Sequence, residues 1–299
     1  MIDRKQLKAE AKARMAQSDP SFWKVALLWM MVSAAVPQMV LSLAGGSTGA
    51  LQKLTQLVQG GIDPELALRA LQLSAGQLAA TWVLNIVLSI FQMVMGFGFV
   101  VYTLRLWRGQ PCGVPDIFSG FSMVGRVIGQ QILVYLIVFG CVILAVIPVT
   151  MAAIYGATAN PVLGALLLIV VSVAITIVLF LVMLNYVLAS TALADRPELG
   201  AMGSIQYGKN LIRGHKGQYA VLLLSFFGWA LLCSIPSGVF SGLYTALELP
   251  LPFWAVSLID LLLTLPVYLW LSPYMQTTIS GFYCALRQEK DSLPQMPPL

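Results

Sequence analysis

Charged side chains are scarce in this sequence, and its longest apolar stretch has none. Charged residues make up 10% of the chain and hydrophobic residues 59%, whereas a soluble domain has about 25% charged residues. No Asp, Glu, Lys or Arg occurs from Val127 to Ala194. A helix of about 20 apolar residues crosses the hydrocarbon core of a bilayer. This stretch therefore predicts two membrane crossings and excludes an ordinary soluble fold.

Residues that commonly bind metals or transfer protons are also few. His215 is the single histidine, which excludes a site of several histidines and an HExxH metalloprotease motif. No two cysteines have CxxC spacing, so we expect free thiols and no zinc site. We predict no catalytic, cofactor-binding or metal-binding residue. The cysteines are Cys112, Cys141, Cys233 and Cys284.

Six apolar segments predict an all-α membrane protein, a six-helix transmembrane bundle with short amphipathic helices at both faces. They cover residues 23–44, 79–104, 127–150, 161–190, 218–243 and 253–275. We expect one membrane domain over residues 23–287, between a basic amphipathic segment (1–22) and a tail (288–299). Prolines within or at the ends of the spans predict kinks; they are Pro37, Pro148, Pro236, Pro266 and Pro273.

The basic residues predict the orientation of these spans. All but Lys53 and Arg69 of the 17 lysines and arginines lie before or at the start of the first span, in the second-to-third and fourth-to-fifth connections, or after the last span. Because lysine and arginine favour cytoplasmic loops, both termini are predicted to lie in the cytoplasm. The net charge of +5 then faces the anionic inner leaflet, and we expect no nucleic-acid partner.

The first span has an alternative interpretation. Ser42-Leu43-Ala44 has the small-x-small form of a signal-peptidase site. The apolar run before it is longer than the 7–15 residues usual for a signal core, which favours a retained helix. Cleavage after Ala44 would leave the other five orientations unchanged, so both alternatives remain open.

Amphipathic segments flank the spans on both sides. Leu7, Ala11 and Met15 form a thin stripe on residues 2–16, typical either of a helix lying on anionic lipid or of a solvated basic flank. In the outer loop, residues 45–78, two apolar stripes separated by Gly60-Gly61 predict two short capping helices.

A cytoplasmic helix is predicted over residues 197–213, with Gly214 at its C-terminal end. Leu199, Met202 and Ile205 fall on one face and are expected to dock onto the membrane or the bundle, leaving Ser204 on the opposite face. With Lys209 and Arg213 they form the candidate interaction face for a membrane or cytoplasmic protein partner.

A polar layer is predicted about 10 Å below the outer surface. It comprises Asp260, Asn85, Gln38 and Ser237, and Asp260 is the one acidic residue well inside a span. We favour a hydrogen-bonded structural cluster over a proton- or solute-handling site, although acids within membranes are enriched at such sites.

Several motifs resemble one known family. They are LADRPEL (193–199), KNLIRGHK (209–216), LSFFGWA (224–230), SPYMQTT (272–278), Phe282-Tyr283 and the opening DRKQLKAEAK (3–12). Together they resemble the bacterial integral membrane protein family catalogued as domain of unknown function 975. The resemblance implies a helical membrane fold and location, and it implies no catalytic residue.

These observations favour a non-enzymatic membrane protein that acts through protein or lipid partners. The alternative is a small transporter or channel built around the Asp260 layer.

Overall fold

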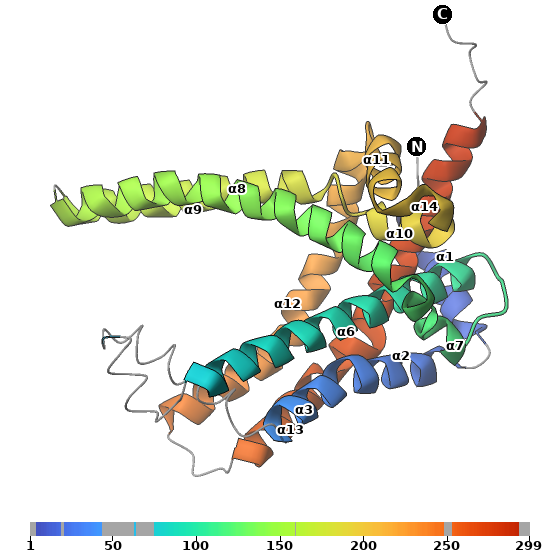
Figure 1. Ribbon diagram of the computed structural model, residues 1–299, viewed down its shortest axis with the longest axis horizontal. Helices are drawn as coiled ribbons and strands as arrows, with labels where there is room; N and C mark the ends of the chain where they lie inside the picture. Colours follow the sequence, from blue (N-terminus) through green and yellow to red (C-terminus); the bar gives the residue numbers. More distant parts are fainter. Residues whose placement is uncertain are drawn as a thin grey trace, which may run out of the picture.

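The computed structural model describes residues 4–18, 21–43, 63, 75–158, 160–247 and 253–292, and every regular element within these ranges is helical (Figure 1). This confirms the predicted all-α class. Five helical stretches are long and apolar enough to cross a membrane: Trp82–Trp107, Val114–Gly156, Val162–Met183, Lys216–Tyr244 and Leu258–Ser292. The first predicted span is helical from Phe22 to Leu43 but is not among the five, so the count of six is not confirmed.

The long helices follow the predicted spans with three shifts of boundary. Helix α8 (Val124–Thr158) continues beyond residue 150, whereas α9 (Pro161–Met183) ends before residue 190 because the chain turns at 184–188. Helix α14 (Ser272–Ser292) continues into the predicted tail. The remaining long helices are α6 (Ala75–Trp107), α12 (Lys216–Ala246) and α13 (Phe253–Pro266). The two predicted capping helices lie outside the described residues.

Two of the prolines lie beside π-helical turns. The turn η1 (Met31–Ala35) joins α2 (Phe22–Met30) to α3 (Val36–Leu43), which contains Pro37. The turn η4 (Val267–Leu271) directly follows Pro266. Proline supplies no backbone N–H, and local π turns are one way for a helix to rearrange the freed carbonyls.

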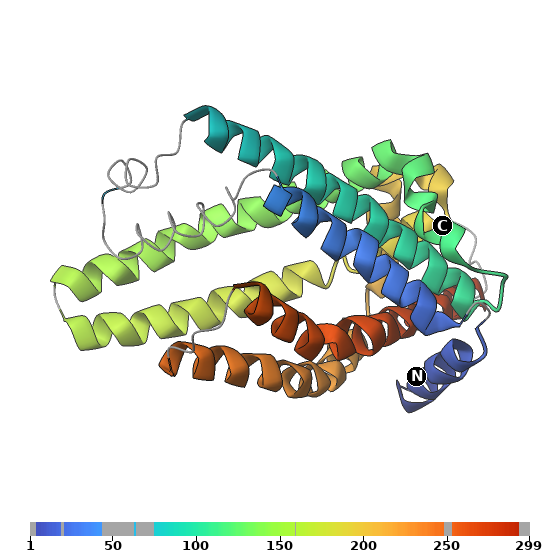
Figure 2. The same cartoon turned by 90° about the horizontal axis from the view of Figure 1, so that it is seen from below.

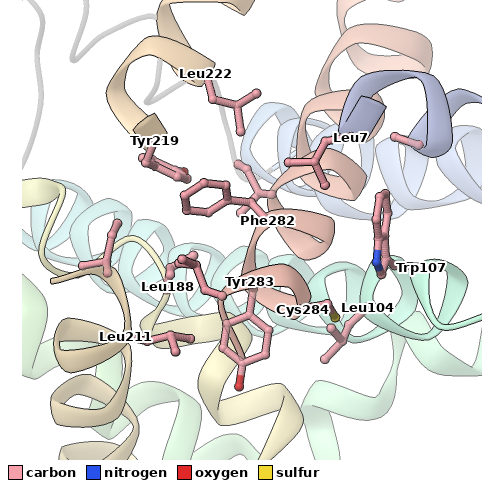
Figure 3. Close-up of a cluster of buried hydrophobic side chains, with 14 of the residues drawn as sticks. Leu7, Leu104, Trp107, Leu188, Leu211, Tyr219, Leu222, Phe282, Tyr283 and Cys284 are labelled. Carbon is pink, nitrogen blue, oxygen red and sulfur yellow. The ribbon is translucent and has the colours of Figure 1, made fainter. Parts of the chain in front are cut away.

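One end of the molecule holds most of the buried core. We call it the packed base: α1 (Arg4–Ala16), the last turns of α6, α7 (Val114–Ile117), α10 (Ala189–Asp195), α11 (Gly200–Ile212), the start of α12, and α14. Figure 3 shows its centre, where the Tyr219 and Phe282 rings lie at a centroid distance of 5.4 Å. Leu7 and Leu188 are buried in the same cluster, so segments far apart in sequence share one core.

A second region consists of α8 beyond residue 134 and all of α9. We call this hairpin the arm; it extends from the base with its tip far from the other helices (Figures 1 and 2). Its two helices approach closely at two glycines, since a Cβ on Gly164 would lie 2.0 Å from the Cα of Gly156. Large apolar side chains such as Leu136 and Leu144 are exposed along it.

Helix α1 packs against protein, which neither interpretation of its sequence anticipated. Leu7 and Ala11 are buried against the other helices of the packed base. The Tyr274 hydroxyl of α14 donates a hydrogen bond to the Lys8 carbonyl at 3.3 Å. The Lys8 ammonium lies 4.1 Å from the centroid of the Phe226 ring, a cation–π contact.

Helix α11 docks through a different face from the one predicted. Gly200, at φ +66°, begins the helix directly after a 3-10 turn at Pro197–Leu199. The helix packs closely at Gly208, where an added Cβ would lie 3.0 Å from the Ala189 nitrogen. Ile205 is buried as expected, but Met202 is 57% exposed and Ser204 is 0% exposed. The prediction that Ser204 lies on the free face is wrong, because the Gln130 amide donates a hydrogen bond to its hydroxyl at 2.9 Å.

Candidate functional site

Asp195 is the centre of a buried charge cluster in the packed base. It is the last residue of α10, and its side chain is 2% exposed. Its carboxylate accepts hydrogen bonds from Arg108 Nη2 at 2.5 Å, Arg287 Nη1 at 2.6 Å and the Tyr283 hydroxyl at 2.7 Å. The cluster therefore joins the chain just after α6 to the end of α10 and to α14.

The partners of Asp195 keep its carboxyl charged. Burial by itself would raise the pKa of Asp195, but the hydrogen bonds from Arg108 and Tyr283 and the positive charges of Arg108 and Arg287 outweigh it, and the pKa is lowered. Hydrogen bonds to the ionised form and nearby opposite charge are what stabilise a buried carboxylate. The Asp195 carboxylate thus stays ionised and holds three segments of the chain together.

A cleft of about 720 Å³ opens beside this cluster, between α1, the end of α6 and α14. Arg14, Arg108 and Arg287 line it together with the carboxylates of Glu10 and Asp291. Arg14 Nη2 lies 3.0 Å from Glu10 Oε1, and Arg287 Nε lies 3.6 Å from Asp291 Oδ2. The cleft thus offers side chains of both charge signs to a ligand or peptide segment.

This cluster was not predicted from the sequence. Asp195 lies in the LADRPEL motif, and Arg108 and Arg287 are among the basic residues that predict the orientation. Two signals were present: Asp195 is the first charge after the long uncharged stretch, and Tyr283 and Arg287 are spaced i, i+4, which places them on one helix face. Neither signal identifies the partners, because the contacts join residues about 90 positions apart.

Two members of the predicted polar layer are in contact. The Ser237 hydroxyl of α12 donates a hydrogen bond to the Asp260 carboxylate of α13. Asn85 is half-buried on α6, where its carbonyl accepts a hydrogen bond from Ser89 at 2.7 Å. The side chain of Gln38 lies outside the described residues. The layer as a whole stays a prediction.

The predicted interaction face on α11 is divided by the docking geometry. Met202, Lys209 and Arg213 are exposed, Leu199 is partly buried and Ile205 is buried. The free part of this face is therefore the basic C-terminal half of the helix with Met202. Among the residues that the structure describes, no group of three or more His, Cys, Asp or Glu side chains is placed to hold a metal ion.

Helices of bilayer length, apolar outer surfaces and a charge cluster at one end are the architecture expected of a helical membrane protein. The chain belongs to the family described as Protein of unknown function (DUF975), which matches residues 1–290. The match confirms the resemblance and includes Asp195, Tyr283 and Arg287. No curated protein and no solved structure matches the chain.

Proposed function

We propose that this protein spans the bacterial cell membrane six times with both termini in the cytoplasm, has no enzymatic activity, and acts by binding lipid or protein partners at the packed base. One observation carries the proposal. The four segments that the positive-inside rule assigns to the cytoplasm all contribute to this base: α1, the region after α6, the α10–α11 connection and the end of α14. A single interlocked basic surface on one side of a membrane suits binding better than catalysis.

The packing of the first helical segment supports a sixth span. Phe22 contacts Tyr102 with ring centroids 6.2 Å apart, and Trp29 stacks on Phe99 at 4.4 Å. Increasing residue numbers on α2 therefore meet decreasing numbers on α6, so the two helices run antiparallel. This is the arrangement of two spans joined by an outer loop.

The structural contacts of the Asp195 carboxylate support a non-enzymatic role. A general acid or base works best with a pKa near the operating pH, whereas the arginines and Tyr283 hold the pKa of Asp195 below its usual value. Asp195, the most deeply buried carboxylate of the packed base, is thus suited to a structural role and unsuited to proton transfer at neutral pH.

The partner role is tested by reconstitution in nanodiscs and mass spectrometry of co-isolated lipids and proteins. Arg14→Gln removes a cleft charge that does not contact Asp195. Arg126→Gln removes a charge from the exposed start of α8, on the same predicted side of the membrane. Loss of a co-isolated partner with Arg14→Gln and its retention with Arg126→Gln would support the cleft as the binding surface. Identical partner profiles for both variants would contradict it.

The orientation has an independent test with topology reporters. Fusions after Glu289 should be active in the cytoplasmic form of the reporter, and fusions near Gly60 in the exported form. The reverse pattern at either position would overturn the proposed orientation.

A transporter built around Asp260 is the second candidate function. The hydrogen bond between Ser237 and Asp260 favours a transporter because this bond joins two adjacent apolar helices through a titratable group. The same bond equally satisfies a structural role, and the Asp260→Asn experiment described below separates the two.

A further inference from the structure

A second cleft lies between α6, α8 and α10, away from the charge cluster. Its volume of about 530 Å³ is within the range of ligand pockets, about 300–1,000 Å³. Ser89 and Gln92 of α6 and Gln130, Gln131 and Tyr135 of α8 contribute hydrogen-bonding side chains to its wall. The part of the wall formed by described residues contains no charged side chain.

Helical spacing turns these groups toward one another. Ser89, Gln92 and Gly96 are separated by three and four residues and share one face of α6, while Gln131 and Tyr135 are four apart on α8. A Cβ added to Gly96 would meet nothing within 4 Å, so the space between the two faces is open at this level.

Three of these side chains have hydrogen-bonding capacity to spare. Gln130 is fixed by its bond to Ser204, but Gln92, Gln131 and Tyr135 make no hydrogen bond with any other described residue. A glutamine amide offers both donors and an acceptor, and a tyrosine hydroxyl does the same. Gln92 and Tyr135 are exposed and Gln131 is half-buried, so their polar groups are accessible to a ligand in the cleft.

The surroundings of the cleft indicate what such a partner looks like. The absence of charge on the described wall gives no preference for phosphate, carboxylate or ammonium groups. Groups that donate and accept at once pair well with hydroxyls. Helix α8 diverges from α6 toward the arm (Figure 1). Ile132 and Leu136, next to the cleft on α8, are exposed and apolar, so an apolar tail has a surface to lie on.

We propose that the cleft between α6 and α8 binds an uncharged, hydroxyl-rich group of the sugar or polyol class. The same chemistry has two sources, a free sugar or the head of a membrane amphiphile. This site is distinct from the cleft on which the proposed function rests.

The test compares thermal unfolding midpoints of the full chain in phosphatidylcholine nanodiscs. The discs contain monoglucosyl diacylglycerol, added free glucose, phosphatidylglycerol, or no addition. The glucosyl lipid should raise the midpoint by about 2–4 °C. A rise with free glucose as well assigns the source to solution, and a rise with the lipid alone assigns it to an amphiphile; either supports the proposal.

Variants connect the rise to the cleft. The double variant Gln92→Leu/Gln131→Leu should abolish it, and Tyr135→Phe, which retains the ring, should reduce it. Gln206→Leu, at an exposed glutamine of α11, should leave it unchanged. No rise in the wild type with either sugar probe, or a rise that survives in the double variant and in Tyr135→Phe, would overturn the proposal. An equal, cleft-dependent rise with phosphatidylglycerol would also overturn it.

Discussion

The packed base and the arm are both built from apolar helices, yet their side chains have opposite surroundings. In the base, Tyr219, Phe282 and Tyr283 are completely buried, and the Asp195 cluster ties the elements together. In the arm, Leu144 and Ile147 project from the protein surface, and the two helices come close together at a pair of glycines. Polar pairs and aromatic packing hold the elements of the packed base together, whereas the exposed side chains of the arm contact whatever medium surrounds the protein.

This difference shows that hydrophobicity alone does not decide which helices pack together. In a bilayer, lipid tails are as apolar as leucine, so exposed leucines carry little drive toward another helix. Association then depends on close approach at small residues and on hydrogen bonds. The base has the buried polar pairs that provide such bonds, whereas the threonine hydroxyls in the described part of the arm bond to backbone carbonyls of their own helix.

The largest expected effect is in the base. Asp195→Ala leaves Arg108 and Arg287 without their shared carboxylate and should lower the free energy of unfolding by about 3–5 kcal/mol. Asp291→Ala removes an exposed carboxylate of the same Arg287, 60% exposed at 3.6 Å, and should cost less than about 1 kcal/mol. Thermal unfolding in nanodiscs measures both. Equal losses would mean that the cluster contributes no more than a surface ion pair.

A large effect is also expected on α11. Ser204→Asp places a charge in a buried position bonded to Gln130 and should lower stability by about 2–3 kcal/mol. Met202→Asp, on the exposed side of the same helix, should change it by about 0.5 kcal/mol or less. Yield of folded protein and unfolding midpoint both report the difference. A destabilised Met202→Asp beside a tolerated Ser204→Asp would place the opposite face against the base.

Glycine substitutions compare the two regions directly. A Cβ on Gly98 would meet the Ile117 carbonyl oxygen at 1.7 Å, whereas one on Gly140 in the arm meets nothing within 4 Å. Gly98→Ala should therefore cost about 1–3 kcal/mol through overpacking. Gly140→Ala should be neutral or stabilise by up to about 1 kcal/mol, because alanine favours a helix. Matched unfolding curves test this, and a destabilising Gly140→Ala would indicate an unseen contact on the arm.

The pH dependence of the free energy of unfolding is expected to be a smaller effect than the substitutions above. Because folding lowers the pKa of Asp195, its contribution is fully present above the unfolded value of about 3.9 and is lost as pH falls through the folded value. The difference in midpoint between wild type and Asp195→Asn should be constant from about pH 5 to 8 and should shrink in stronger acid. A difference that grows in acid would contradict the lowered pKa.

The smallest effect is expected at Asp260. Asp260→Asn keeps the size and polarity that the Ser237 hydroxyl requires, so stability should change by about 0.5 kcal/mol or less, while Asp260→Leu should lower the midpoint. Proton flux in reconstituted vesicles is the second measurement. A folded Asp260→Asn variant that loses a wild-type flux would favour the transporter, since the titratable charge is gone.

Local pattern explains which parts of the structure could be predicted. The spans followed from apolar length, and Gly214, at φ +93° after α11, followed from the end of a helical stripe. The face through which α11 docks did not follow from it, because that face is defined by close packing at Gly208 and by the hydrogen bond between Gln130 and Ser204, which a hydrophobic pattern does not reveal. The apolar stripe on α1 was visible in Leu7 and Ala11. The surface that the stripe contacts could not be predicted, since lipid, water and protein can each accommodate so thin a stripe.

The sequence by itself determined the helical class, the family and the approximate limits of the long helices, because apolar runs and short motifs are local properties of the chain. Only the tertiary structure decided that Asp195 meets Arg108, Tyr283 and Arg287, that α1 belongs to the core, and that polar side chains of α6 and α8 face one cleft. Each of these depends on residues distant in sequence, where a few directional hydrogen bonds select one arrangement among many that bury the same apolar surface.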